Sequence, residues 1–207
     1  MGYNVLAVGA HPDDIEMGCG ATLAKHLELK DEVFVLVLTK GERGGHSSGS
    51  EECMASLEKL GIKKPNIIFG SFPDGFVTDD FATVSFIESH IRKFKIDKVY
   101  THYPDDRHQD HRNCSNAVSA AARKVPEILL FQGPSTKVFD PHYFIEVSRE
   151  HMDKKLAAVG CYESQISKGT VSPAVQESLS RYYGISNNAE YVEAFAINHL
   201  LKRNSNV

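Results

Sequence analysis

Two clusters of histidine and aspartate carry the side chains of this sequence that are best suited to hold a metal ion. The first spans residues 11–14, His-Pro-Asp-Asp, and directly follows the apolar run 5–8. The second spans residues 105–111, Asp-Asp-Arg-His-Gln-Asp-His, and follows another apolar run at 99–101. Imidazole nitrogens and carboxylate oxygens are ligands of catalytic zinc, which keeps one coordination position open for water. Together the two clusters predict a metal-dependent hydrolase.

In the first cluster the chain leaves its apolar run through a tight turn. Pro12 has a fixed φ and biases His11 toward an extended conformation, so the side chains that follow have preset directions. Asp13 and Asp14 are neighbours and cannot point the same way, so one can bind a metal while the other takes a proton from water. The residues themselves do not say which aspartate does which. The alternative interpretation is that both only cap the helix predicted from Ile15 onward.

In the second cluster, His108 and His111 stand three residues apart at a predicted helix start, so their rings can lean to one side of the first turn. His11, one aspartate of the first cluster and His111 would supply two imidazoles and one carboxylate, a ligand set known for catalytic zinc. Asp106 or Asp110 could accept the second ring proton of a histidine and hold its orientation. A His-x-x-His pair alone is a weak signal, and its weight here comes from the first cluster.

The elements that must position these clusters alternate between short β-rich runs and stretches of helical periodicity. This alternation is typical of an α/β fold. Strands are predicted at residues 5–8, 33–38, 66–69, 98–101, 128–131 and 143–147, and helices at 21–27, 54–60 and 86–94. After residue 147 the pattern predicts mostly helix, at 152–162, 173–183 and 192–201.

The predicted fold is a Rossmann-like α/β fold: a mostly parallel sheet with core order 3-2-1-4-5, flanked by helices, and a mainly helical C-terminal part. The run 33–38 is continuously apolar, as expected of a strand that is covered on both faces. In this order the first and fourth strands are neighbours, and ligands bind beyond their carboxyl ends. The two clusters would meet there, with the loop from Thr39 on the rim. His102 ends the fourth strand beside them, but it is interpreted as structural, like the histidines outside the two clusters.

Length and composition favour one domain that spans residues 1–207. A chain of this length with 42% hydrophobic residues can bury one core. No apolar run is long enough to cross a membrane and no leader is recognised, so a cytoplasmic protein is expected. The net charge of −4 and the absence of a stripe of Lys and Arg argue against nucleic acid as a partner. The four cysteines form no Cys-x-x-Cys pair, so neither a thiolate zinc site nor a disulfide scaffold is predicted.

The sequence resembles the LmbE-like, or PIG-L, family of zinc-dependent N-deacetylases. The similarity rests on the two clusters with their flanking residues, and it extends through Thr39-x-Gly41-Glu42, Leu60-Gly61, Pro73-Asp74-Gly75, Tyr162-x-Ser164-Gln165 and Tyr191-x-Glu193-Ala194-Phe195. It therefore covers nearly the whole chain. The resemblance implies a Rossmann-like sheet, one zinc ion and removal of the acetyl group from an N-acetylglucosamine-type amino sugar or its conjugate. It also makes a homo-oligomer a reasonable expectation.

The resemblance further implies a role for individual residues. The family's metal ligands fall on His11, Asp14 and His111, which would hold one zinc ion or another divalent metal. Its general base falls on Asp13, which ranks the two aspartates that the residues alone leave equal. In this assignment the bound metal lowers the pKa of a water molecule, and Asp13 takes the proton as the water attacks the acetyl group.

The family's second histidine falls on His108, which would stabilise the oxyanion and donate a proton to the leaving amine, with Asp110 tuning it. Two positions depart from the pattern. Asp106 stands where some relatives have a tyrosine, so a phenolic donor is absent there. Gly49 stands where many relatives have an arginine, which removes an expected substrate contact.

Arg43 and Arg107 remain as candidate substrate contacts. A guanidinium group suits a carboxylate or phosphate because it can bind two oxygens at once. The alternative is that both are surface arginines without a partner, because single arginines near a cleft carry little information. The expected ligand is in either case a small amino sugar or a conjugate of one.

Three other functions compete with the deacetylase. An amidase that cleaves a larger acyl group from an amino sugar conjugate would use the same metal chemistry. A non-catalytic metal-binding protein could share the fold, because fold does not decide function, although an intact Asp13 argues against it. A dinucleotide-binding domain is disfavoured, because position 23 is Leu and the Gly-x-Gly-x-x-Gly pattern fails after Gly18.

Overall fold

The computed structural model describes residues 2–43 and 49–201, which form seven strands and seven α-helices. The strands are β1 (Asn4–Gly9), β2 (Glu32–Val37), β3 (Ile67–Phe69), β4 (Lys98–His102), β5 (Glu127–Phe131), β6 (Tyr143–Val147) and β7 (Tyr191–Leu200). The helices are α1 (Asp14–Glu28), α2 (Gly49–Leu60), α3 (Phe81–Phe94), α4 (Gln109–Ala121), α5 (Arg149–Val159), α6 (Glu163–Ile166) and α7 (Pro173–Ser186). A short 3₁₀ helix, η1 (Lys64–Asn66), precedes β3.

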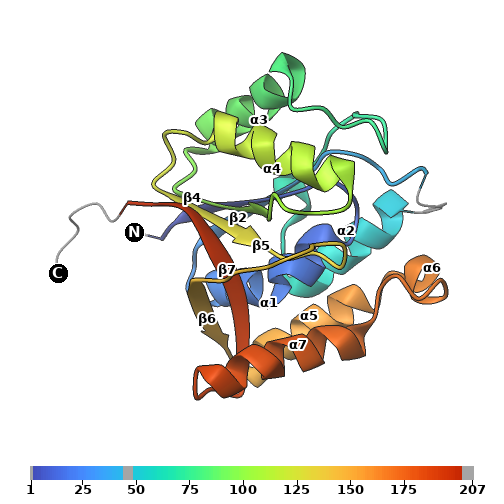
Figure 1. Ribbon diagram of the computed structural model, residues 1–207, viewed down its shortest axis with the longest axis vertical. Helices are drawn as coiled ribbons and strands as arrows, with labels where there is room; N and C mark the ends of the chain where they lie inside the picture. Colours follow the sequence, from blue (N-terminus) through green and yellow to red (C-terminus); the bar gives the residue numbers. More distant parts are fainter. Residues whose placement is uncertain (1, 44–48, 202–207) are drawn as a thin grey trace.

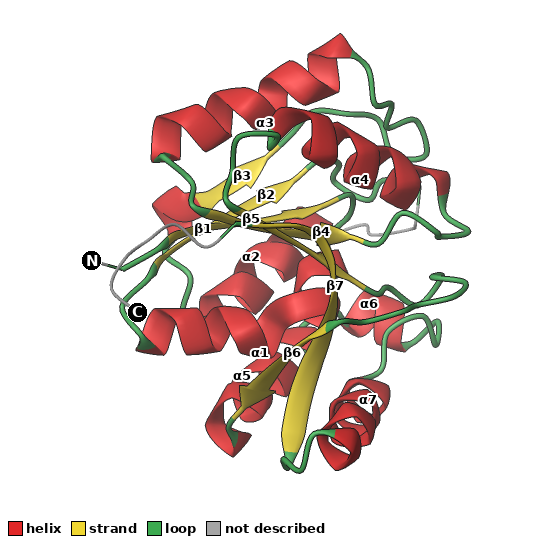
Figure 2. Ribbon diagram, turned by 60° about the vertical axis from the view of Figure 1, so that its left-hand side comes forward, coloured by secondary structure: helices red, strands yellow, loops and turns green. Residues whose placement is uncertain are grey.

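The strands form one sheet in the order β3-β2-β1-β4-β5-β7-β6. The first five strands of this order run parallel, and β7 pairs antiparallel with both β5 and β6. Helices α3 and α4 cover one face, while α1, α2 and α5 cover the other (Figures 1 and 2). The predicted α/β class and the core order 3-2-1-4-5 are confirmed.

The C-terminal part differs from its prediction. Residues 192–201 were expected to form a helix, and this is wrong because they form most of β7. All six residues from Tyr191 to Ala196 are buried, with β5 and β6 on either side of β7 and α7 packed against it, whereas Ile197, Asn198 and His199 are exposed. A strand buried in this way loses the alternation of apolar and polar residues, so its periodicity does not distinguish it from a buried helix. The C-terminal part is therefore a mixture of helices and antiparallel strands.

Strand β2 shows why the sheet needs helices on both faces. Val33, Val35 and Val37 point into the core cluster below the sheet, together with residues of α1 and α2. Phe34 and Leu36 alternate with them and point into the other cluster, with residues of α3 and α4. Alternate residues of the strand thus point to opposite faces of the sheet, and the run is apolar throughout because both faces are covered.

The edge of the sheet that β7 and β6 form turns toward α5 and α7 (Figure 2). Helix α5 packs against α1 and α2, and α7 packs against β7. The C-terminal part therefore lies directly on the helix that follows the first cluster of histidine and aspartate. Within the described residues, no helix has the length and apolar character needed to cross a membrane. The four cysteines are free thiols, three of them buried.

Gly18 in α1 approaches the sheet more closely than a side chain would permit. A Cβ atom at this position would lie 2.3 Å from the ring of Phe131 in β5. We expect Gly18→Ala to lower the free energy of unfolding by about 1 to 3 kcal/mol, the usual cost of overpacking a core. Urea unfolding measures the change. The control is Gly20→Ala, whose Cβ would lie 3.2 Å from Lys155 Cγ and 3.7 Å from Leu60 Cδ2, so a shift of a few tenths of an ångström accommodates it. An equal loss in both variants would contradict the close approach.

Candidate active site

A cavity of about 570 Å³ opens beyond the carboxyl ends of β1 and β4. These two strands are parallel neighbours, so the turns that leave them meet at one edge of the sheet. The cavity wall consists of residues from both clusters, from α1 and from four further segments: His11, Asp13, Asp14, Met17, Gly41, Arg43, Asp74, Gly75, His108, Gln109, His111, Pro134, Ser135, Gln165 and Thr170. The fold thus brings together two groups of residues that are far apart in the sequence.

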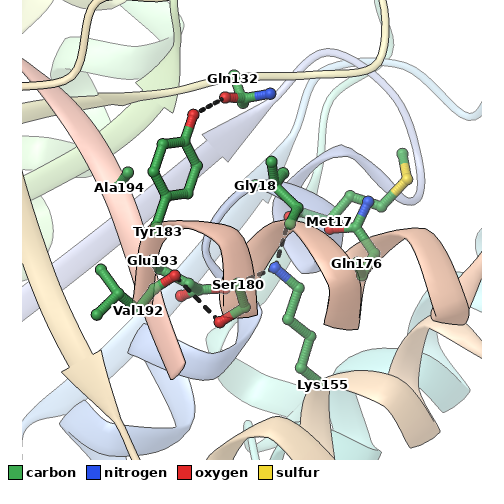
Figure 3. A pocket seen from close by; sticks show the side chains of 11 residues that line it. Met17, Gly18, Gln132, Lys155, Gln176, Ser180, Tyr183, Val192, Glu193 and Ala194 are labelled. Carbon is green, nitrogen blue, oxygen red and sulfur yellow. Dashed lines mark hydrogen bonds and ion pairs between the residues drawn. The ribbon is translucent and has the colours of Figure 1, made fainter. Parts of the chain in front are cut away.

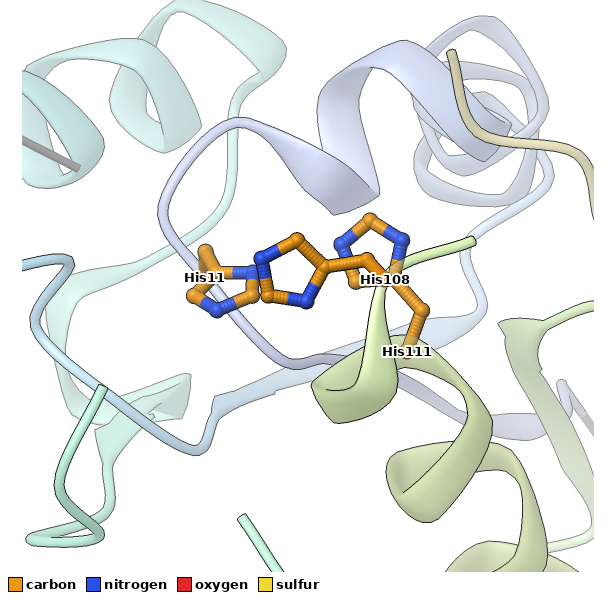
Figure 4. A group of neighbouring side chains, drawn as sticks. All are labelled: His11, His108 and His111. Atoms are coloured by element: carbon orange, nitrogen blue, oxygen red, sulfur yellow. The ribbon is translucent and has the colours of Figure 1, made fainter. Parts of the chain in front are cut away.

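Three of the histidines that line this cavity lie next to one another (Figure 4). His11 comes from the turn after β1, whereas His108 and His111 come from the start of α4. The ring centroids of His108 and His111 are 4.6 Å apart, and His11 lies 4.7 Å from the first and 5.3 Å from the second. One nitrogen of each ring lies within 4.8 Å of a nitrogen of the other two.

Two pairs of the predicted ligands have the spacing that one ion requires. Asp14 lies between two rings, with His11 Nδ1 at 3.4 Å from Oδ2 and His111 Nε2 at 3.3 Å from Oδ1. Two ligands of a tetrahedral zinc ion, each about 2.0 to 2.1 Å from the metal, are about 3.3 to 3.4 Å apart. Each of these two contacts suits a zinc ion, or a divalent ion of similar size, but they use different oxygens of Asp14. The ligand atoms that all lie within 4.8 Å of one another form three overlapping groups: His11, His108 and His111; Asp14, His102 and His111; and His11, Asp74 and Asp110. The three predicted ligands are thus spread over these groups.

The charges around these residues also favour a cation. Burial alone would lower the pKa of His11, but hydrogen bonds with Asp110, Asp14 and Asp74 raise it to about 12. Burial likewise opposes the charge on His111, yet Asp14 and Asp106 raise its pKa to about 9. Buried carboxylates thus surround both rings and need a positive charge beside them. A divalent cation would supply that charge.

Asp110 holds the ring of His11. Its carboxylate is fully buried, lies 3.1 Å from His11 Nε2, and accepts hydrogen bonds from the backbone of Gly75 at 2.7 Å and Val77 at 3.1 Å. The resemblance instead implied that Asp110 tunes His108. In the structure the contact with His108 is made by the backbone, because the Asp110 N–H donates to His108 Nδ1 at 3.2 Å.

Asp106 holds the ring of His111. Its Oδ1 lies 3.4 Å from His111 Nδ1, and its carboxylate also accepts from Ser135 Oγ, from Thr136 Oγ1 at 3.0 Å and from the backbone of His108 at 2.8 Å. Aspartates that bond the far nitrogen of a ligand histidine fix its tautomer and orientation. The sequence left open whether Asp106 or Asp110 holds a histidine ring. In the structure both do, because Asp110 contacts His11 and Asp106 contacts His111.

Asp13 stands apart from this network. It occupies the N-cap position of α1, but its side chain accepts no hydrogen bond from the first turn, which argues against a capping role. Its φ of 89° is rare for a residue other than glycine, and such strain is concentrated at functional sites. Burial, together with the charges of Asp14 and Glu16, raises the pKa of its carboxyl well above the usual value. Among the described residues, the Asp13 carboxyl group thus makes no capping bond and lies on the cavity wall, where it can meet water or substrate.

His108 presents a neutral ring to the cavity. Burial, followed by the charges of His11 and His111, lowers its pKa. Its Nδ1 accepts the hydrogen bond from Asp110, and among the described residues its Nε2 has no hydrogen-bond partner. The ring nitrogen that remains is therefore the one that can meet a ligand.

Two residues of the site were not singled out from the sequence. His102 is buried, with Nε2 3.1 Å from Asp14 Oδ2 and its ring stacked on that of His111 at a centroid distance of 4.1 Å. Burial, followed by the charge of His111, lowers the pKa of His102 to about 4. Asp74 lies 3.3 Å from His11 Nε2 and accepts the backbone N–H of Arg43 at 2.7 Å. The available signals were the place of His102 at the end of β4 and the Pro-Asp-Gly turn around Asp74.

The two arginines differ in their placement. Arg43 lines the cavity and lies over the exposed ring of Phe76, 4.4 Å from its centroid. Arg107 is exposed and is not part of the cavity wall. Residues 44–48 of the predicted rim loop lie outside the described residues. Gly49 begins α2, and Glu52 in the same helix accepts hydrogen bonds from the backbone and hydroxyl of Ser164.

Comparison with known proteins identifies the family. Residues 6–122 match the family model described as PIG-L, GlcNAc-PI de-N-acetylase. The chain belongs to the PIG-L family. It is 36% identical over 169 residues to the uncharacterized deacetylase YaiS of Escherichia coli (strain K12), covering 77% of this chain and 90% of that protein. It is 28% identical over 218 residues to the diacetylchitobiose deacetylase of Thermococcus kodakarensis, covering 91% and 80%.

Two solved structures share the fold over nearly their whole length. The conserved protein TT1542 of Thermus thermophilus has a TM-score of 0.84 at 26% identity, with 99% of this chain and 100% of that chain covered. GalB, the 4-carboxy-2-hydroxymuconate hydratase of Pseudomonas putida KT2440, also has a TM-score of 0.84, at 21% identity and 99% coverage of both chains. The family resemblance noted in the sequence is confirmed, and with it the prediction of a hydrolytic N-deacetylase of the PIG-L family.

We expect the purified protein to carry about one zinc or other divalent ion per chain. Replacing His11, Asp14 or His111 by Ala removes one of three ligands and should sharply lower the metal content, which elemental analysis measures. His90→Ala on α3 is the control and should keep the metal. Full metal content in all three ligand variants would contradict the assignment.

Proposed function

We propose that the protein removes the N-acetyl group from an N-acetylglucosamine-type amino sugar or its conjugate, with zinc or another divalent ion held by His11, Asp14 and His111. The observation that carries the proposal is the Asp13 carboxylate, which makes no capping bond and lies on the cavity wall beside this donor set. The family model, whose description names a GlcNAc derivative, and the relative that deacetylates diacetylchitobiose support the choice of substrate. The cavity volume of about 570 Å³ lies within the usual range for small-molecule sites.

When bound, the metal supplies two kinds of chemistry: it lowers the pKa of a water molecule and polarises the acetyl carbonyl. Asp13 is placed to accept the proton of the attacking water, because its carboxylate makes no capping bond and lies on the cavity wall. Asp106 and Asp110 keep the two ligand rings in place, so that little reorganisation is needed during the reaction.

His108 has the features expected of an oxyanion donor. Its ring borders the ligand histidines, and its Nδ1 is held by the backbone of α4, so its orientation is fixed. With Nδ1 as an acceptor, the neutral ring carries its proton on Nε2, which can stabilise the charge that develops on the acetyl oxygen. Loss of the amine requires a proton, which Asp13 can return or His108 can donate.

A substrate panel tests the proposal directly. Acetate release would be measured with N-acetylglucosamine, diacetylchitobiose and N-acetylglucosamine conjugates with neutral and charged groups, on protein of known metal content. N-butyryl analogues test the alternative of an amidase for larger acyl groups, and an unsaturated dicarboxylate tests hydration instead of hydrolysis. Turnover of N-acetyl sugars supports the proposal; turnover of only the longer acyl or unsaturated compounds would replace it. A metal-loaded protein that turns over none of them would favour a binding function.

Replacing Asp13 by Asn separates catalysis from metal binding. Asn tolerates the left-handed backbone region as Asp does, so the turn should be retained. We expect Asp13→Asn to keep its metal but to lose at least about a hundredfold in kcat, the scale of general acid–base catalysis. Acetate release and metal content are measured on the same sample. Normal turnover by this variant would return Asp13 to a structural role.

Arg43 is the candidate contact for a charged group on the substrate. If it binds an anion, Arg43→Ala should raise KM for a negatively charged conjugate by about tenfold to a hundredfold, which corresponds to about 1.5 to 3 kcal/mol for a charged hydrogen bond. KM for free N-acetylglucosamine should change little. Arg107→Ala, on the exposed surface, is the control. Equal effects on charged and neutral substrates would mean that Arg43 only supports its loop.

A further inference from the structure

Helix α1 is broken at Cys19, where φ is −147° and ψ is 18°. The break separates the first turn, which begins with Asp14, from the longer remainder of the helix. Sharp kinks arise at a proline, at glycines, or where a side chain enters the hydrogen-bond ladder of the helix. Helix α1 contains no proline, but Gly18 and Gly20 flank the break and favour it. The groups that enter the ladder here are Lys155 and Glu193, which form a buried ion pair.

The ion pair takes up backbone groups on both sides of the break. In a regular helix the N–H of Ala21 would donate to the carbonyl of Met17, four residues earlier. Here Ala21 N donates to Glu193 Oε1 at 3.2 Å, and Thr22 N donates to Oε2 at 2.6 Å. The Met17 carbonyl accepts from Lys155 Nζ at 2.7 Å, and Nζ lies 2.6 Å from Glu193 Oε1 (Figure 3). The two charged side chains thus bind the backbone groups that the break leaves without partners in the helix.

Both partners come from the C-terminal part of the chain. Lys155 belongs to α5 and Glu193 to β7, and each side chain is only 4% exposed. A buried ion pair is weak evidence for stability, because the desolvation of two charges offsets their attraction. Its better attested use is to specify one arrangement among several. The arrangement specified here is the angle of the first turn of α1.

We propose that Lys155 and Glu193 are positioning residues that hold the first turn of α1, and with it Asp13 and Asp14, in the geometry of the active site. A short path connects the pair to the turn: Lys155 binds the Met17 carbonyl, and the Met17 N–H donates to the Asp13 carbonyl at 3.0 Å. The inference rests on the roles proposed for Asp13 and Asp14, and adds two residues from outside the cavity wall.

Other contacts hold the same turn and limit the expected effect. The Tyr162 hydroxyl donates to Glu16 Oε1 at 2.6 Å, and Gly18 packs directly on Phe131. Loss of the ion pair should therefore loosen the turn without unfolding it. We expect changes of about tenfold in the properties of the site, and not a complete loss.

The test uses the double variant Lys155→Met/Glu193→Gln, because removal of one partner alone would leave a buried charge unpaired. The matched control is Lys98→Met/Glu127→Gln. It removes a second buried ion pair, in which Nζ and Oε2 are 2.9 Å apart. This pair lies at the starts of β4 and β5, the ends of the strands that face away from the cavity. Three properties are measured on both: amide hydrogen exchange of residues 13–22 in the metal-free protein, zinc affinity by chelator competition, and kcat for acetate release. If the double variant does not fold, Lys155→Gln/Glu193→Gln is used, since it also leaves no unpaired charge and keeps an acceptor for the two amides.

The positioning role predicts at least tenfold faster exchange of residues 13–22 than in the control at a similar thermal stability. It also predicts about tenfold weaker zinc binding and a lower kcat. Exchange and zinc affinity equal to those of the control would reduce the pair to a structural role and overturn the inference. Faster exchange and weaker zinc binding in a protein that turns over no N-acetyl sugar would uphold the positioning role and overturn the proposed reaction.

Discussion

The concentration of buried carboxylates beyond β1 and β4 is the constraint on which the site depends. Asp14, Asp106 and Asp110 are nearly or fully shielded from water, and each lies within 3.4 Å of His11 or His111. An isolated buried charge is very unfavourable, so every one of these carboxylates must have partners. Backbone N–H groups, hydroxyls and imidazoles supply part of the compensation. The raised pKa values of His11 and His111 show that the remaining demand is for positive charge, which a divalent cation meets.

The fold meets this constraint by distributing the partners over many elements. The turn after β1 supplies His11, the start of α4 supplies Asp110 and His111, and the loop after β3 supplies the amides of Gly75 and Val77. A parallel sheet with helices on both faces keeps these loops at one edge, where they can approach closely. The backbone is strained as a result: Asp13, at the start of α1, has a left-handed φ, and α1 is broken at Cys19.

Local patterns in the sequence predict the parallel core and the meeting of the two clusters, because the apolar runs 5–8 and 99–101 and the turn at Pro12 are local signals. They fail where non-local contacts decide. Residues 191–196 have no strand alternation, because all six are buried in the first part of β7. Asp13 and Asp14 are adjacent and of one type, so only their bonds in the fold distinguish them. The ion pair of Lys155 and Glu193 links three distant segments. Glu193 falls in the pattern Tyr191-x-Glu193-Ala194-Phe195, but the local sequence gives it neither a partner nor a role, and Lys155 carries no local signal.

The fold does not decide the reaction, since a hydratase shares it at a TM-score of 0.84. Both reactions take a proton from water and deliver a proton elsewhere: hydration delivers it to a carbon, and hydrolysis of an amide delivers it to the departing amine. Asp13 makes no capping bond that would hold its carboxylate elsewhere, and the neutral ring of His108 carries a proton on Nε2. These two groups can therefore serve either reaction. The PIG-L family model and the named deacetylase relatives, and not the fold or the acid and base alone, favour the deacetylase.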